Sequence, residues 1–221
     1  MVKFLENRKR VFWEALLLTV VVFLFGLLIG IVYESSKSSD MNEYYSVSEL
    51  SLMDIFALNS LVNVDSEDCL ILTESNLDFA DRIYEEAKTL AKYEAAGKIT
   101  KEIEIVHKRY DVLRTFLWIN TIKTSEKCEK DYSTVVYLYE YSSDDLTKKA
   151  EQNVWSKILS DFKEQEGGGI LLIPIAADSN LTSLDSLISK FKITEYPVVI
   201  IDEKYVIKDL SSVEELEKYL S

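Results

Sequence analysis

An uninterrupted apolar run near the N-terminus constrains this chain more than any other feature. Residues 15 to 33 read ALLLTVVVFLFGLLIGIVY, nineteen positions without a charged side chain. As an α-helix the run would be roughly 28 Å long, about the thickness of bilayer hydrocarbon. Val11, Phe12 and Trp13 extend it toward the headgroup level. We therefore expect residues 11–33 to form an uncleaved transmembrane signal-anchor helix.

The alternative interpretation of this run is a cleaved signal peptide. Signal peptides usually have a shorter apolar core, about 7 to 15 residues, and end in small residues of the A-x-A kind. Here the run closes with GIVY and continues with ESSKS, which is a poor cleavage site. The anchor is therefore favoured over the signal peptide.

The basic residues on either side of the run predict its orientation. Four precede the run and one follows it closely, namely Lys3, Arg8, Lys9 and Arg10 before it and Lys37 after it. The positive-inside rule places the more basic flank in the cytoplasm. Residues 1–10 are therefore expected to be cytoplasmic, and the C-terminal domain is expected to lie outside the cell membrane.

The net charge and a glycine pair in the anchor bear on the partners of this chain. The formal net charge is −13, and no Lys/Arg cluster occurs beyond the short basic segment before the anchor. A surface that binds the phosphates of nucleic acid needs such a cluster, so no nucleic-acid partner is expected.

Within the anchor, Gly26 and Gly30 form a G-x-x-x-G pair through which two copies could pack as a homodimer.

Helical patterns dominate the residues that follow the anchor. Residues 34–45 are polar and predict a short tether or a helical extension of the anchor. Residues 46–128 form a helical region whose last two helices, about 76–96 and 99–124, repeat apolar residues at steps of three and four. Because the connection between these two helices is short, they predict an antiparallel hairpin. The single histidine, His107, lies opposite the apolar seam of the hairpin, so we expect it to be exposed.

Beyond residue 132 the apolar period changes, and strands alternate with helices. The predicted elements are strand 134–139, helix 144–165, strand 170–176, helix 182–191, strand 198–202, strand 205–209 and helix 212–220. The strands are rich in β-branched residues, and GGG at 167–169 stops the first helix. This order predicts an α/β domain, residues 132–221, in which a mixed sheet carries helices on both faces.

Cap residues support the predicted helix starts. At five places a Ser or Thr is followed three residues later by an acid, which is the spacing of a capping box. These pairs are Ser46/Glu49, Ser75/Asp78, Ser142/Asp145, Thr182/Asp185 and Ser211/Glu214.

For the helix at 144–165, the predicted buried face consists of Leu146, Ala150, Val154, Ile158 and Phe162.

The order of elements in residues 132–221, closed by TEYPVVIID, resembles the thioredoxin fold. In that family a cis proline precedes the third strand and faces the active-site turn, and Pro197 occupies the corresponding place. With its anchor and helical hairpin, the whole chain is similar to membrane-anchored thioredoxin-like proteins of archaea. The resemblance implies that a partner binds beside Pro197.

The turn after the first strand departs from the redox members of this family. In those members it carries two cysteines separated by two residues, and the helix dipole stabilises the attacking thiolate. Here the matching turn carries Ser142, Ser143, Asp144 and Asp145. Serine cannot exchange disulfides, and carboxylates would oppose a thiolate. We therefore expect a degenerate active-site turn whose residues cap the following helix.

Other catalytic, metal or cofactor sites are not expected. His107 has no set of Cys or carboxylate residues at metal-ligand spacing around it. No nucleophile–His–acid signature or phosphate loop occurs, and the GGG follows a helix rather than opening one. Asn180, Leu181 and Thr182 form a glycosylation sequon, which becomes usable if the domain lies outside the membrane.

The two cysteines flank the predicted hairpin. Cys69 lies just before its first helix and Cys128 just after its second. An antiparallel hairpin brings these ends together, and the outer side of a membrane is oxidising, so a disulfide is expected. The alternative is a working redox pair.

These features together predict a non-catalytic, membrane-anchored interaction or scaffold protein. The resemblance implies that a protein or peptide partner pairs with the backbone in a groove beside Pro197 and the turn 140–145. The alternative function is a thiol–disulfide oxidoreductase that uses Cys69 and Cys128.

Overall fold

The computed structural model describes residues 10–32, 46, 49, 50, 53, 66–95 and 101–220. The chain divides into two units, Met1–Glu43 and Tyr44–Ser221, and each is described by itself. The predicted tether at 34–45, most of the helix expected to begin at Ser46, and the first two residues of the predicted helix 99–124 lie outside the described residues.

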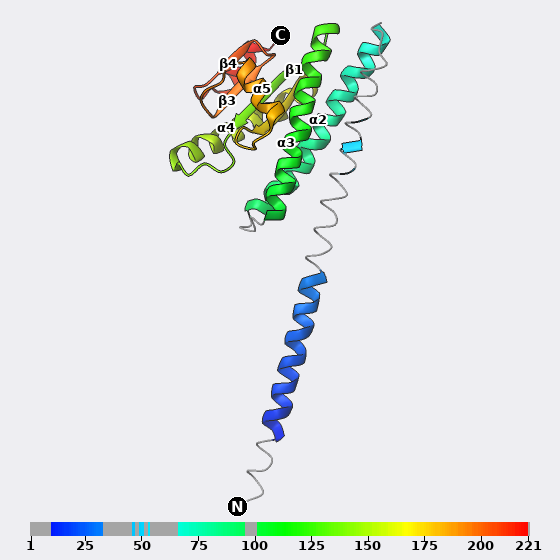
Figure 1. Ribbon diagram of the computed structural model, residues 1–221, viewed down its shortest axis with the longest axis vertical. Helices are drawn as coiled ribbons and strands as arrows, with labels where there is room; N and C mark the ends of the chain where they lie inside the picture. Colours follow the sequence, from blue (N-terminus) through cyan, green and yellow to red (C-terminus); the bar gives the residue numbers. More distant parts are fainter. Residues whose placement is uncertain are drawn as a thin grey trace, which may run out of the picture. The chain divides into compact units, whose positions relative to one another are not determined.

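The first unit contains one long apolar helix, Arg10–Val32 (Figure 1). Its length and composition suit a membrane span, although a signal sequence meets the same criterion. Its one hydroxyl is satisfied within the helix, because Thr19 Oγ1 donates to the Ala15 carbonyl at 2.9 Å. Gly26 and Gly30 have open space around the position of a Cβ. The surface of this glycine pair is therefore open, and the homodimer stays a prediction.

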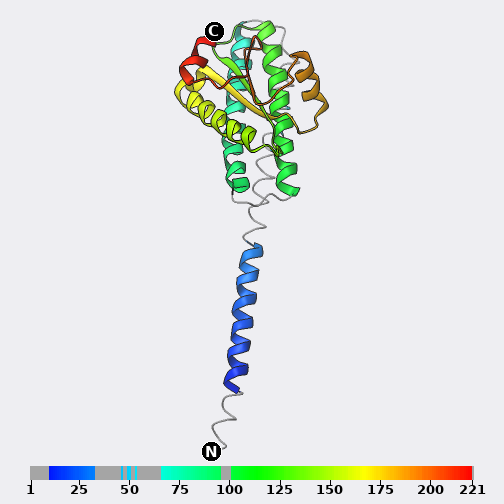
Figure 2. The same ribbon diagram turned by 90° about the vertical axis from the view of Figure 1, so that its left-hand side faces the viewer.

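The second unit begins with a helical hairpin, α2 (Ser66–Ala95) and α3 (Lys101–Lys127), whose helices lie side by side (Figures 1 and 2). The helices are antiparallel, since contacts join the start of α2 to the end of α3. Between them Asn120 Nδ2 donates to Asn76 Oδ1 at 2.6 Å, and Asn76 Nδ2 donates to Thr124 Oγ1 at 3.2 Å. The predicted helix start at Ser75 is wrong, because α2 begins nine residues earlier, at Ser66.

Four strands form one mixed sheet in the order β2-β1-β3-β4. The strands are β1 (Ser133–Tyr139), β2 (Ile170–Ala176), β3 (Val198–Ile201) and β4 (Tyr205–Ile207). Strands β1 and β2 are parallel, whereas β3 runs antiparallel to both β1 and β4. The predicted α/β class and mixed sheet are confirmed, and β2 spans the residues that its apolar run predicted.

Side chains of β1, β2 and β3 are buried on both faces of the sheet, apart from half-buried Tyr139 and Pro174. On one face, alternate residues such as Val135 and Tyr137 pack against α4 (Leu146–Glu166) and α6 (Val213–Leu216). Successive strand residues point to opposite faces, and the intervening Val136 and Leu138 are also buried. In Figure 2, α4 lies beside the red C-terminal segment, and α5 (Thr182–Lys190) lies apart from both.

The hairpin packs onto the sheet through both of its helices. Helices α2 and α3 each contact β2. From α2, Asp81 pairs with Lys163 of α4 at 2.9 Å, and Tyr84 lies within 3.3 Å of Ser160. The indole ring of Trp118 in α3 stacks on Phe191, which follows α5, with 5.3 Å between ring centroids. The hairpin therefore belongs to the same packed unit as the sheet.

The predicted buried face of α4 is wrong for most of its residues. Leu146 is 79% exposed and Val154 is 47% exposed. Ala150 is exposed and Ile158 half-buried, so only Phe162 of the five is buried. A step of four residues overshoots one helical turn by about 40°, so five such residues spread over about 160° of the helix. The buried side chains are Gln152, Trp155, Leu159 and Phe162.

Candidate functional site

The carboxyl ends of β1 and β2 meet at one edge of the sheet, where ligands bind in many α/β proteins. Three segments follow or precede strands there: residues 140–145 after β1, residues 177–180 after β2, and residues 194–197 before β3. We call these three segments the carboxyl edge. All four residues of the expected degenerate turn, and Pro197, belong to it.

The turn after β1 is held by one carboxylate from the neighbouring segment. Asp178 accepts hydrogen bonds from the backbone amides of Tyr141 and Ser142, one on each carboxylate oxygen, both at 2.8 Å. Ser143 is buried, whereas Ser142 and Asp144 are exposed. The amides of Tyr141 and Ser142 are therefore already bound within the protein.

The amino end of α4 is likewise occupied. Asp145 is its N-cap residue, and its Oδ1 accepts from the amides of Thr147 at 2.8 Å and Lys148 at 3.3 Å. The predicted cap at Ser142 is therefore wrong, since α4 begins three residues later than that pair implies. A negative side chain at this position compensates the helix dipole. The dipole that would stabilise a thiolate is here neutralised by a fixed carboxylate.

The residue before the turn is tied to α4 by its backbone and by its side chain. The Glu140 amide donates to Gln152 Oε1 at 2.9 Å, and Gln152 Nε2 donates to the Glu140 carbonyl at 3.0 Å. Lys148 Nζ donates to Glu140 Oε1 at 2.8 Å. Because Gln152 is buried, this reciprocal pair fixes the position at which the chain leaves the sheet.

The Tyr196–Pro197 peptide bond is cis, and it lies beside the end of β1. Val198 pairs with Leu138, so antiparallel register brings Pro197 level with Tyr139. Burial raises the pKa of Tyr196, and the nearby carboxylates of Asp185, Glu140 and Asp178 raise it further. Segments from three parts of the chain thus converge here.

His107 lies under the carboxyl edge and is only 7% exposed, so the prediction that it is exposed is wrong. Its Nε2 is 3.1 Å from the Tyr139 hydroxyl, and its ring lies 4.0 Å from that of Tyr141. The seam of the hairpin had predicted only one buried side of α3. The sheet covers the side of α3 that carries His107, which buries a residue that lies off the seam.

A buried acid next to His107 joins α3 to the end of β2. Asp111 Oδ1 accepts from the Ala176 amide at 3.2 Å and lies 3.4 Å from Arg114 Nη1, while Oδ2 lies 3.6 Å from His107. Burial raises the pKa of Asp111, and the opposing effects of His107 and Arg114 only partly offset it. Sequence reasoning missed this cluster, although polar residues at 107, 111 and 114 share one side of a helix. Their spacing was the available signal for a second buried face.

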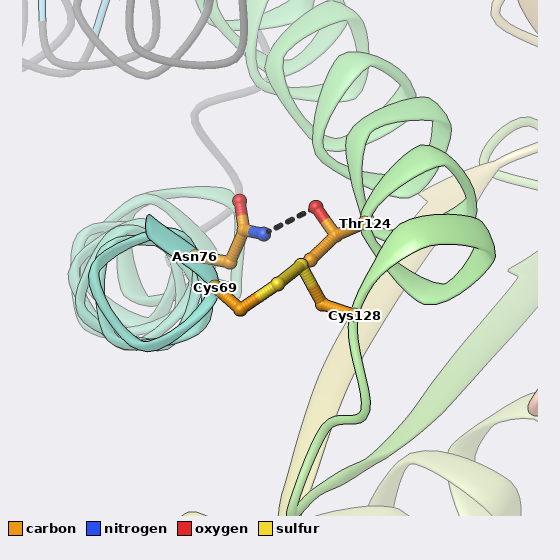
Figure 3. Close-up of a disulfide and its surroundings, with 4 residues drawn as sticks. All are labelled: Cys69, Asn76, Thr124 and Cys128. Atoms are coloured by element: carbon orange, nitrogen blue, oxygen red, sulfur yellow. Dashed lines mark hydrogen bonds between the residues drawn. A yellow bond between two sulfur atoms is a disulfide. The ribbon is translucent and has the colours of Figure 1, made fainter. Parts of the chain in front are cut away.

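The opposite end of the sheet carries the disulfide. Cys69 and Cys128 are bonded, with 5.5 Å between their Cα atoms, and Asn76 and Thr124 lie beside them (Figure 3). Cys128 follows α3 as expected, but Cys69 lies in the first turn of α2 rather than before it. The expected disulfide is therefore present, and its position in α2 differs because the helix begins earlier than predicted.

An ion pair reinforces this end of the sheet. Asp202 Oδ1 accepts from Lys130 Nζ and from the Thr134 amide, both at 2.9 Å. Burial alone would raise the pKa of Asp202, but the hydrogen bonds from Lys130 and Thr134 outweigh it and lower the pKa. Trp118 Nε1 donates to Glu203 Oε1 at 3.1 Å. We call the disulfide, Lys130 and the turn residues 202–203 the disulfide end.

Asn180 lies on the exposed rim of the carboxyl edge, and its Nδ2 donates to the Asp178 carbonyl at 3.3 Å. Among the residues that the structure describes, no group of three or more His, Cys, Asp or Glu side chains is placed to hold a metal ion.

Comparison with protein-family models, with curated proteins and with solved structures gives no match to this chain.

Proposed function

We propose that this protein is a membrane-anchored, non-catalytic binding protein with a degenerate thioredoxin-like domain outside the cell membrane. The order of strands and helices after residue 132 supports the thioredoxin-like assignment, as does a cis proline that precedes β3 and lies beside the end of β1. The apolar helix Arg10–Val32, with its basic flank on the N-terminal side, supports the anchor and its orientation.

One observation carries the non-catalytic part of the proposal: carboxylates occupy the turn that a redox enzyme would use for a thiolate. Asp178 binds two amides of the turn, and Asp145 binds two amides of the first turn of α4. An incoming anion would meet negative charge and donors that are already engaged. This arrangement stabilises the turn and opposes thiolate chemistry.

The carboxyl edge is also the best place for a partner. Ser142, Asp144, Thr194 and Glu195 are exposed there, and the apolar side chain of Leu146 is 79% exposed directly after the turn. An extended peptide can pair with backbone at the end of a strand while an apolar side chain contacts one of its residues. We therefore assign the partner surface to the carboxyl edge and Leu146.

One observation favours the alternative, a thiol–disulfide oxidoreductase. Cys69 lies in the first turn of α2, where a helix dipole favours a thiolate. Against this, a working disulfide needs accessible sulfur, and Cys128 is only 7% exposed. The same pair also joins two packed helices, which is the role of a structural bond.

Site-specific photo-crosslinking in native membranes tests the proposed surface. A photo-reactive side chain at Ser142 and one at Thr194 should give the same adduct, because both positions belong to the carboxyl edge. The matched control is Ser156, an exposed residue of α4 outside this edge. Leu146→Asp should abolish the adduct without unfolding the protein, since Leu146 is not part of the core. Adducts that are equal at Ser156 and Ser142 would contradict the assignment.

A further inference from the structure

We propose that Asn180 is N-glycosylated. The inference rests on the outer location in the proposed function, because oligosaccharide transfer to Asn-x-Thr is typical of secreted domains. Asn180-Leu181-Thr182 is the one such sequon in the 221 residues, so a single glycan is expected. The structure adds evidence that the sequence alone does not contain.

Both side chains that the sequon needs are at the surface. Asn180 lies in the turn between β2 and α5, and Thr182 is the first residue of α5; both are exposed. The φ angle of Asn180 is +53°, a left-handed conformation that Asn adopts more readily than most residues. The folded domain can therefore carry a glycan at this position without displacing core residues.

Thr182 does not have the structural role that its position suggests. A Thr at a helix start commonly accepts a hydrogen bond from the helix as its N-cap. The N-cap position of α5 is instead Leu181, and no side chain caps the helix there. The contact with Ser186 uses the Thr182 backbone carbonyl, not its hydroxyl. Capping therefore does not explain Thr182, whereas its place two residues after an exposed Asn does fit a sequon.

Asn180 Nδ2 attacks the anomeric carbon of a lipid-linked oligosaccharide pyrophosphate, the donor class that the proposal requires. A nitrogen–carbon bond forms, the carbon–oxygen bond to the carrier breaks, and the lipid pyrophosphate leaves with the electron pair. The nitrogen loses one proton to a base and keeps one. That remaining hydrogen suffices for the bond that Nδ2 makes to the Asp178 carbonyl.

The location of this glycan would matter for the partner surface. Asn180 is two residues from Asp178, whose carboxylate holds the turn after β1. A glycan on Asn180 would therefore stand at the rim of the carboxyl edge. It would restrict approach from that side and favour a slender, extended partner segment over a broad protein surface.

The test uses the full chain in its native membrane and reads the mass of the tryptic peptide 164–190. The native protein and Thr182→Ser, which keeps the sequon, should carry a sugar mass on this peptide. Thr182→Ala and Asn180→Gln should lose it completely and gain electrophoretic mobility by one step. Labelling of exposed lysines with a membrane-impermeant amine reagent on intact cells measures the location of the domain independently.

The outcomes separate the glycan from the proposed function. A domain that is labelled from outside, with peptide 164–190 free of sugar, overturns the glycosylation and leaves the location intact. A domain that is labelled only after lysis overturns both. A sugar that persists in Thr182→Ala would also contradict the inference, since that variant has no sequon.

Discussion

The two ends of the sheet are built differently. At the disulfide end, a covalent bond joins the two helices of the hairpin, and Asp202 of the β3–β4 turn binds Lys130 and the Thr134 amide at the start of β1. At the carboxyl edge, hydrogen bonds to the exposed side chain of Asp178 hold the turn, and buried Gln152 and His107 contact the same segment from α4 and α3. Binding sites commonly lie on exposed loops, such as those of the carboxyl edge, that a rigid scaffold holds in position. Under the proposed function, the disulfide end provides stability and the carboxyl edge provides recognition.

Removal of the disulfide should have the largest effect on stability. Its cysteines are 59 residues apart, and closing a loop of that length contributes about 4 kcal/mol in the chain-entropy model. We expect the double variant Cys69→Ser, Cys128→Ser to lose about that free energy of unfolding, measured by denaturant titration of the full chain in detergent. Lys157→Ala, on the exposed side of α4, is the control. A loss below about 1 kcal/mol would mean that the bond is not a structural element.

Removal of Asp202 should have the next largest effect. Asp202→Ala removes the acceptor of the Thr134 amide and the carboxylate partner of Lys130, which should cost about 3 kcal/mol. The pKa of Asp202 is lowered on folding, so its contribution is complete above its ordinary pKa of about 3.9 and is lost as the pH falls through the lower folded value. The difference between Asp202→Ala and the native chain should therefore shrink below about pH 4. A constant difference down to pH 2 would contradict this account, and exposed Asp209→Ala is the control.

Local sequence patterns predicted β1, β2 and β3 well because nearly every residue of these three strands is buried. All seven residues of β2 except Pro174 are buried. Such an apolar run identifies a strand without information on which elements pack against it. The pairing of Cys69 with Cys128 was also predictable, since a hairpin determines which ends meet. The burial of His107 was not, because it depends on a sheet that begins 26 residues later in the chain.

The carboxyl edge was the hardest part to predict for the same reason. Pro197 and the turn 142–145 were identified through a family resemblance. Asp178, which holds that turn, is 37 residues from Tyr141 in sequence, and no local pattern links them. Charged and polar residues at the surface have many alternative partners, so their contacts depend on the completed fold.

Removal of Asp178 should weaken the carboxyl edge without unfolding the domain. Asp178→Ala leaves two amides of the turn to water, and the expected loss of stability is about 1 to 2 kcal/mol. The larger consequence should be for recognition: the crosslink from Ser142 should fall strongly, while the domain keeps its fold. Asp144→Ala, an exposed acid of the same turn, should leave both unchanged. Equal effects of the two variants would contradict a specific role for Asp178.

The smallest expected effect is that of the turn side chains on redox activity. The triple variant Ser142→Ala, Ser143→Ala, Asp144→Ala should reduce insulin no faster and no slower than the native chain, and both rates should equal the uncatalysed rate. The physical reason is that the turn carries no thiol. Reductase activity well above background in the native chain would overturn the non-catalytic assignment and favour the cysteine pair as an active site.

The most direct test of the central claim is the thiol state of Cys69 and Cys128 in native membranes. Protein is alkylated before and after reduction, and its mobility is compared on non-reducing gels. A structural disulfide outside the membrane predicts that neither cysteine reacts before reduction and that exchange with glutathione is slow, since Cys128 is buried. Two freely alkylated thiols would contradict both the bond and the outer location, and rapid turnover with glutathione would identify a redox enzyme instead.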